Sequence, residues 1–469
     1  MQHIRGVSRQ QTALFPATIE EYVATDHPVR VVDAFVEAVD TAELGFERAV
    51  PEATGRPPYD PRDLLKLYLY GYLNQIRSSR RLERECHRNV ELMWLLGRLA
   101  PDFKTIANFR KDNGEAIRGV CRAFVVFCRE QQLFGRELVA IDGSKFQAAA
   151  SRKRAITAKQ AKRAIAEIDE QINEYLNGFD DTDDPEHDEP VDGATASAVE
   201  ALQRRKSELN ALVRQMAEQG VHQVVEGEPD AKIMRSGEGS STIGYNVQTA
   251  VDAKHKLIVH HEVVTDGNDH HQLYPMATRA KATLEADTLS VVADAGYRNG
   301  EQVERCEQEG IETAVPTQRT INPHGHYFGR DAFTYDEKAD TYRCPAGEIL
   351  TFRTVQNRDR MRMYTTDVCG DCQLRQDCTK GKRRWVSRSF DASASEVSDA
   401  RFTRERMNQR RAIVEHPFGT IKRMMGNGRF LTRGLRSVRT ETALSVTAYN
   451  LLRVINILGV PRMLDCFAR

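Results

Sequence analysis

The sequence lacks the features that would place the protein in a membrane or outside the cell. No apolar run approaches the roughly 20 residues that a membrane-spanning helix needs, and the most apolar late stretch, Leu444 to Val460, is interrupted by Arg453. The first residues, Met1 to Arg5, lack the apolar block of a signal peptide. Nine cysteines in 469 residues do not resemble a secreted disulfide framework. These absences predict a cytoplasmic protein with no membrane partner.

An excess of charge of either sign is also absent, because 67 basic residues balance 67 acidic ones. The distribution is uneven, however. Residues 180–192 hold eight acids and no lysine or arginine, whereas residues 401–440 hold eleven lysines and arginines and two acids. This asymmetry fits a local nucleic-acid face beside an acidic loop, and it fits a solvated helix surface equally well.

The length predicts two or three folding units, of which the first is helical. Asp60-Pro61 is typical of a helix start, and the apolar residues that follow continue to Tyr72. Residues 102–111 fit a short capped helix that ends in positive charge, as a DNA-reading helix or an ordinary surface helix would. A basic cluster lies between them, at Arg77, Arg80, Arg81 and Arg84.

Strand patterns begin near residue 138. The expected order is a strand at 138–142, a hairpin at 243–251 and 257–265, a helix at about 270–285, a strand at 289–294, a helix at 300–309 and a strand at 312–316. This order predicts a mixed α/β sheet with helices on its faces. Two insertions interrupt it: a helical hairpin with a mobile tip at 155–235, and a cysteine-rich segment at 320–400.

Two of the expected strands end in an aspartate followed by small residues, Asp142-Gly143 and Asp294-Ala295-Gly296. Carboxylates at strand ends beside glycine are natural ligands for a hard divalent cation. Either aspartate alone would more often be a turn former. The pair therefore predicts a metal site only if a third ligand joins it.

Glu415 is the candidate third ligand, because it stands in an almost purely basic segment. On a helix, Arg411 and Glu415 share a face, which is equally typical of an exposed ion pair. Pro417 is expected to kink or restart the helix after His416. The spacing alone therefore leaves open whether Lys422 points the same way as Glu415.

Four of the cysteines are clustered, and the Cys369–Cys372 pair has the C-x2-C spacing of a zinc knuckle. The four are Cys344, Cys369, Cys372 and Cys378. This pattern favours a structural Zn²⁺ site over free core thiols, although Cys344 lacks a matching C-x2-C partner. The other five cysteines are scattered and are expected to be core thiols.

Several motifs together resemble the bacterial insertion-sequence transposases of the DDE class, in particular the group numbered eleven eighty-two. The resemblance covers nearly the whole chain. Its motifs are the block from Pro58 to Lys111, IDGSK at 141–145, GYNVQ at 244–248, ADAGY at 293–297 and EHPFGTIKR at 415–423. A related Tyr-x2-Arg-x3-Glu-x6-Lys signature matches Arg411, Glu415 and Lys422, but its tyrosine position is Asn408.

The resemblance implies a ribonuclease-H-like fold with the catalytic triad Asp142, Asp294 and Glu415. It further implies two Mg²⁺ (or Mn²⁺) ions per active site, cleavage at insertion-sequence ends, and joining of the 3′-OH to target DNA by phosphoryl transfer. Expected DNA contacts are Arg411, Lys422, Arg423 and Lys145. The implied units are an end-binding helical domain at 1–130 and a catalytic domain at 135–469.

The implied partner is double-stranded DNA, as terminal inverted repeats and as target. A homodimer or larger assembly is expected in the synaptic complex, and the protein is expected to be associated with the bacterial nucleoid. Two alternatives remain open at this point. The chain could be a decayed or domesticated transposase that only binds DNA, or a metal-dependent DNA nuclease on the same fold.

Overall fold

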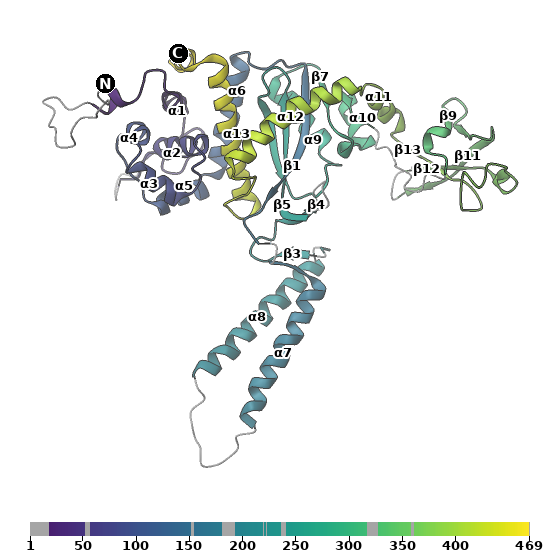
Figure 1. The fold of residues 1–469 in the computed structure, drawn as a ribbon, viewed down its shortest axis with the longest axis horizontal. Helices are drawn as coiled ribbons and strands as arrows, with labels where there is room; N and C mark the ends of the chain where they lie inside the picture. The colour runs from purple at the N-terminus through teal and green to yellow at the C-terminus, as the bar shows by residue number, and fades with distance from the viewer. Residues whose placement is uncertain are drawn as a thin grey trace, which may run out of the picture.

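The computed structural model describes residues 18–51, 57–151, 154–180, 193–218, 220–221, 223–235, 241–316, 327–357 and 361–468. Helices at the N-terminal end lie beside a central sheet, a helical hairpin projects from that sheet, and a smaller sheet lies on the side opposite the N-terminal helices (Figure 1). The tip of the hairpin, residues 181–192, for which mobility was expected, lies outside the described residues.

The N-terminal segment is helical, as the sequence predicted. Its helices are α1 (Pro28–Glu37), α2 (Pro61–Leu73), α3 (Ser79–Cys86), α4 (Val90–Leu95), α5 (Phe103–Asp112) and α6 (Gly114–Glu130), after a short 3-10 turn η1 (Ile19–Tyr22). Asp60 caps α2 by accepting from the backbone N–H of Arg62, and Asp102 caps α5 by accepting from Lys104 and Thr105. Both caps satisfy backbone donors that the first helical turn leaves free.

The central sheet contains β1 (Leu138–Gln147), β4 (Lys232–Arg235), β5 (Ser241–Asp252), β6 (Ile258–Val264), β7 (Leu289–Val292) and β8 (Ile311–Ala314). The hairpin β5–β6 is antiparallel, and β5 also pairs antiparallel with β1. β1, β7 and β8 are parallel neighbours. Five of these strands lie side by side in the order β6, β5, β1, β7, β8. When the five are numbered in chain order, the spatial order is 3-2-1-4-5. This order fits the ribonuclease-H-like arrangement that was expected.

One expectation about β1 was wrong, since the strand does not end at Asp142. It continues to Gln147 because Gly143 to Gln147 keep pairing with β5, so Asp142 lies within β1. Gly143 is needed there for space: a Cβ at this position would lie 2.3 Å from Nε2 of Gln248 and 2.7 Å from Oδ1 of Asp269. Asp142 nevertheless lies past the last β1–β7 pair, Ala140 with Val292.

Helices cover the sheet. They are α9 (Leu273–Leu284), α10 (Gly300–Gln308), α11 (Ala392–Ala400), α12 (Arg404–Met424), α13 (Leu435–Leu458) and α14 (Val460–Phe467). α12 packs against β1, β5 and β7, and α9 packs against β5, β6 and β1. The helix α12 runs unbroken through Pro417, so the expected restart after His416 does not occur.

The two insertions are separate small units. The helical hairpin consists of α7 (Ala158–Asp180) and α8 (Gly193–Glu218), with the short strands β2 (Ala155–Thr157) and β3 (Gln223–Val225) paired at its base. The cysteine-rich segment forms an antiparallel sheet in the order β13 (Val386–Ser389), β12 (Met361–Thr365), β11 (Ile349–Gln356), β10 (Thr341–Arg343), β9 (Thr334–Asp336). Each insertion has its own small hydrophobic cluster.

The N-terminal helices and the sheet share one hydrophobic core. That cluster joins residues of α1, α2 and α6 to residues of β1, β7, α9 and α13. Among the described helices, no single one is long and apolar enough to cross a membrane; α13 and α14 pass that test only as a pair bent by 110°.

Candidate active site

The parallel register of β1 and β7 brings Asp142 and Asp294 to the same level of the sheet. Ala140 pairs with Val292. Asp142 lies two residues after Ala140, and Asp294 lies two residues after Val292. Asp294 caps the 3-10 turn η3 (Ala295–Tyr297) and accepts a hydrogen bond from Gly296 N–H at 2.8 Å. Asp142 accepts from Gly143 N–H at 2.9 Å. The backbone therefore fixes both carboxylates at one end of the sheet.

A single cation connects the two carboxylates. Nη2 of Arg410, on α12, donates to Oδ1 of Asp142 at 2.6 Å and lies 3.3 Å from Oδ2 of Asp294. The Arg410 side chain is only 11% exposed, and its Nε has no hydrogen-bond partner. One carboxylate oxygen from β1 and one from the residue that caps η3 thus lie on either side of one positive nitrogen, and carboxylate oxygens are also the ligands that a hard divalent cation accepts.

Burial raises the pKa of Asp142 to about 6; the Arg410 guanidinium opposes this rise and the Asp294 carboxylate adds to it. A partly desolvated pair of like charges is costly unless a cation neutralises it. Such a perturbed pair is typical of a functional site.

A polar network lies beside β1, and the sequence did not predict it. Oδ1 of Asp269, in the loop before α9, accepts from Nδ2 of Asn246 at 2.7 Å and from Nε2 of Gln248 at 2.6 Å. Tyr297 donates its hydroxyl proton to Gln248. Asn246 and Gln248 lie two residues apart on β5, and both are fully buried. Two amides at alternate positions of a predicted strand were the pattern from which a buried polar network could have been predicted.

Lys145 belongs to this network. Its Nζ lies 3.7 Å from Oδ1 of Asp269, and its side chain is 20% exposed. Burial lowers the pKa of Lys145. The contact of Lys145 with DNA stays a prediction, because in this arrangement the ammonium group is paired with a carboxylate.

The continuous helix α12 settles the direction of Lys422 relative to Glu415. At about 100° per residue, Arg411, Glu415 and Lys422 fall within about 40° of one another around the helix axis. Nζ of Lys422 lies 5.6 Å from the centre of the Phe146 ring on β1. Burial lowers the pKa of Lys422, and the Asp142 carboxylate opposes that shift. Lys422 therefore lies near the aspartate pair.

Glu415 is exposed, and the described residues give it neither an ion pair nor a hydrogen bond. The structure thus brings Asp142 and Asp294 together but leaves Glu415 without a contact to them. Arg411 and Arg423 are likewise exposed on α12. Within the described ranges, no group of three or more histidine, cysteine, aspartate or glutamate side chains is gathered as a ready-made metal site.

Fold and site together define a class: a mixed α/β sheet, with a strand order that fits the ribonuclease-H-like arrangement, that carries paired aspartates on β1 and after β7. Two family models match the chain, "Transposase domain (DUF772)" over residues 17–112 and "Transposase DDE domain" over residues 220–451. Asp294 and Glu415 lie inside the second match and Asp142 lies outside both. These matches support the assignment of the chain to the DDE-type transposases.

No curated protein matches the chain. One solved structure that matches is a "piggyBac transposase synaptic complex with hairpin DNA", with 8% sequence identity and a TM-score of 0.35 over 96% of this chain and 80% of that one. No conclusion rests on a similarity of that size.

Proposed function

We propose that this protein is a DNA transposase that cuts at the ends of an insertion sequence of the eleven eighty-two group and joins the freed 3′-OH to target DNA. The observation that carries the proposal is the convergence of Asp142 and Asp294 on one guanidinium nitrogen. Cleavage and joining of a phosphodiester do not require a covalent intermediate with the protein. A site made of carboxylates and cations is therefore sufficient.

Asp142, Asp294 and Glu415 are the proposed ligands of two Mg²⁺ (or Mn²⁺) ions. When bound, such a pair supplies an activated attacking oxygen and stabilisation of the leaving 3′ oxygen. Asp142 would contribute the most deeply enclosed carboxylate of the set, since its side chain is 20% exposed and that of Asp294 is 46% exposed. For Glu415 to join, its exposed side chain has to turn toward β1 from the face of α12 that it shares with Lys422.

The cations of α12 are the proposed contacts to the DNA backbone. Arg411, Lys422 and Arg423 are placed to hold phosphates and so to position the strand, without reading bases. Lys145 would join them only by leaving Asp269. The N-terminal helices up to residue 130 are the proposed readers of the terminal inverted repeats, and a dimer or larger assembly is proposed for the synaptic complex at the nucleoid.

The test is a transposition assay with purified protein. The donor DNA carries the sequences that flank this gene in its element, and a supercoiled plasmid serves as target. Wild-type protein with Mg²⁺ should cut at the ends and produce joined products. Asp142→Ala, Asp294→Ala and Glu415→Gln should bind the ends normally and lose cleavage.

Glu405→Gln is the matched control, because Glu405 is the other acid of α12 and is also exposed. It should cut like wild type. Cleavage without joining would indicate a nuclease, and binding without cleavage would indicate a DNA-binding protein. Near-normal cutting by any one triad variant would remove that residue from the proposed site.

A further inference from the structure

The cysteine-rich segment forms a sheet with very little core. Its strands are β9 (Thr334–Asp336), β10 (Thr341–Arg343), β11 (Ile349–Gln356), β12 (Met361–Thr365) and β13 (Val386–Ser389). The buried cluster of this unit consists of Phe333, Tyr342, Leu350, Tyr364 and Val386. A unit of this size usually needs a further tie, such as disulfides or a metal, to be stable.

The four clustered cysteines lie in two loops at one end of this sheet. Cys344 opens the tight turn from β10 to β11, where its N–H donates to Glu348 O at 2.9 Å and its carbonyl accepts from Gly347 N–H at 2.9 Å. The other three lie in the long connection from β12 to β13. Cys369 belongs to the 3-10 turn η6 (Asp367–Gly370), and Cys372 and Cys378 follow it.

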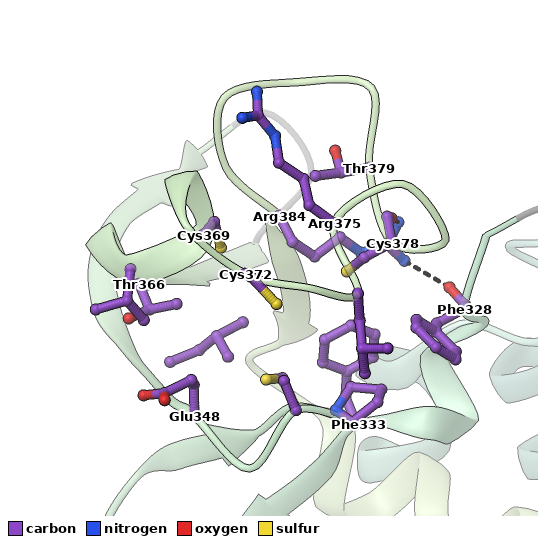
Figure 2. Close-up of a pocket in the computed structure, with 16 residues that line it drawn as sticks. Phe328, Phe333, Glu348, Thr366, Cys369, Cys372, Arg375, Cys378, Thr379 and Arg384 are labelled. Carbon is purple, nitrogen blue, oxygen red and sulfur yellow. Dashed lines mark hydrogen bonds between the residues drawn. The ribbon is translucent and has the colours of Figure 1, made fainter.

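All four cysteines line a single cavity, whose other walls include Phe328, Phe333 and Leu350. Figure 2 shows Cys369, Cys372 and Cys378 around the same space, although they come from successive turns of the loop. None of the four forms a disulfide, and all are half-buried. Burial raises the pKa of the Cys378 thiol, and the three other thiols of the cluster add to that rise. Four convergent thiols with no partner are unusual for a packing role.

Two arginines border the same cavity. Arg384 donates to the carbonyls of Cys378 and Phe328, both at 3.1 Å, and Arg375 donates to Gly370 O at 3.3 Å. Four thiolates around one divalent zinc leave two negative charges, and the Arg384 guanidinium, which donates to the Cys378 carbonyl, offsets part of that excess.

We propose that Cys344, Cys369, Cys372 and Cys378 bind one structural Zn²⁺ ion that ties the β10–β11 turn to the β12–β13 loop. The thiols release their protons as the four Zn–S bonds form. As they lie, the described side chains form no ready-made metal group. The site therefore closes when zinc binds, as in other small units whose folding is coupled to metal. The site is closed to water, it has no catalytic part, and it does not depend on the function proposed above.

Elemental analysis of the purified, reduced, full-length protein is the first test. It should give about one zinc per chain. Zinc should also be released stoichiometrically when a thiol-blocking reagent is added, which a chromogenic chelator detects without any variant. Less than about a tenth of an equivalent in folded, reduced protein that was grown and purified with zinc would overturn the proposal.

Cobalt replacement is the second test, because Co²⁺ in a tetrahedral thiolate site absorbs strongly in the visible range. Wild-type protein should show this band at one equivalent of Co²⁺. Cys372→Ser should weaken the band and make the segment protease-sensitive, whereas Cys378→His, which keeps a ligand, should shift the band. Cys466→Ser is the control, since Cys466 is also half-buried but lies on α14. An unchanged band in Cys372→Ser and Cys378→His would contradict the assignment.

Discussion

Arg410 donates to both aspartates of the site, yet nothing in the run Gln409-Arg410-Arg411 distinguishes it from its neighbour. The sequence did predict that Asp142 and Asp294 lie close together, since each follows a short apolar run. It did not identify Arg410 or Asp269, because their roles depend on how α12 and the loop before α9 pack on the sheet. Such contacts between distant segments leave no local pattern.

Arg410→Ala should tighten the binding of divalent metal in the absence of DNA. The guanidinium occupies the space between the carboxylates, and a charge-assisted contact of this kind is worth about 1.5 kcal/mol. Its removal should therefore lower the Kd for Mn²⁺ about tenfold. Titration of Mn²⁺ followed by electron paramagnetic resonance at pH 8, well above the pKa of Asp142, measures this.

The neighbouring Arg411→Ala is the control, because Arg411 is exposed and has no described contact with the aspartates. It should leave Mn²⁺ affinity unchanged. Weaker Mn²⁺ binding in Arg410→Ala would mean that the arginine supports the metal site and does not compete for it.

At the scale of elements, the sequence predicted most of the central strands and helices to within a few residues. The hairpin β5–β6, the strands β7 and β8 and the helices α9 and α10 appear where their patterns indicated. The end of β1 was misjudged because Gly143 was interpreted as a terminator, although it makes room for Gln248 and Asp269. The break at Pro417 was misjudged because tertiary packing of α12 on the sheet holds the helix together.

The strand β6 carries a histidine pair that should make stability depend on pH. Burial, with a smaller contribution from Arg122, lowers the pKa of His260 to about 4 and that of His261 to about 3. An unfolded histidine titrates near 6.5, so the unfolded chain binds more protons below that pH. Stability is therefore fully present above pH 6.5 and is lost as the pH falls toward 4.

His261→Asn should reduce this loss. Between pH 7 and pH 5 the variant should lose about 1 kcal/mol less stability than wild type, which is half the full linkage value because the ring is partly exposed. Urea unfolding at the two pH values measures the difference. Parallel curves for the two proteins would show that His261 titrates normally in the folded state.

On the scale of the whole molecule, one buried ion pair joins the N-terminal helices to the C-terminal ones. Nη1 of Arg77 donates to Oε1 of Glu441 at 2.8 Å, and the two side chains are 9% and 0% exposed. Arg77 also donates to the carbonyls of Met425 and Arg429. No local pattern predicts this pair, because 364 residues separate its members.

Glu441→Ala should lower the free energy of unfolding by about 3–5 kcal/mol, because it leaves the Arg77 guanidinium buried without its counter-ion. It also removes the acceptor for the N–H groups of Leu431 and Thr432. Guanidinium chloride unfolding measures the loss. Glu405→Ala, at an exposed position of α12, should change stability by less than about 0.5 kcal/mol, and an equal effect of both changes would contradict the importance of the pair.

The shared core limits how such a protein can be rearranged in evolution. Among the helices before residue 130, α2, α5 and α6 pack directly on α13, and α6 also packs on α9, so their exchange for those of a relative would expose these surfaces. A recombination event that exchanges these helices would have to exchange α13 with them. The helical hairpin and the cysteine-rich sheet have their own clusters, and the paired strands β2 and β3 bring the two ends of the hairpin together. Lineages are therefore expected to gain, lose or trade these two units far more freely than the N-terminal helices.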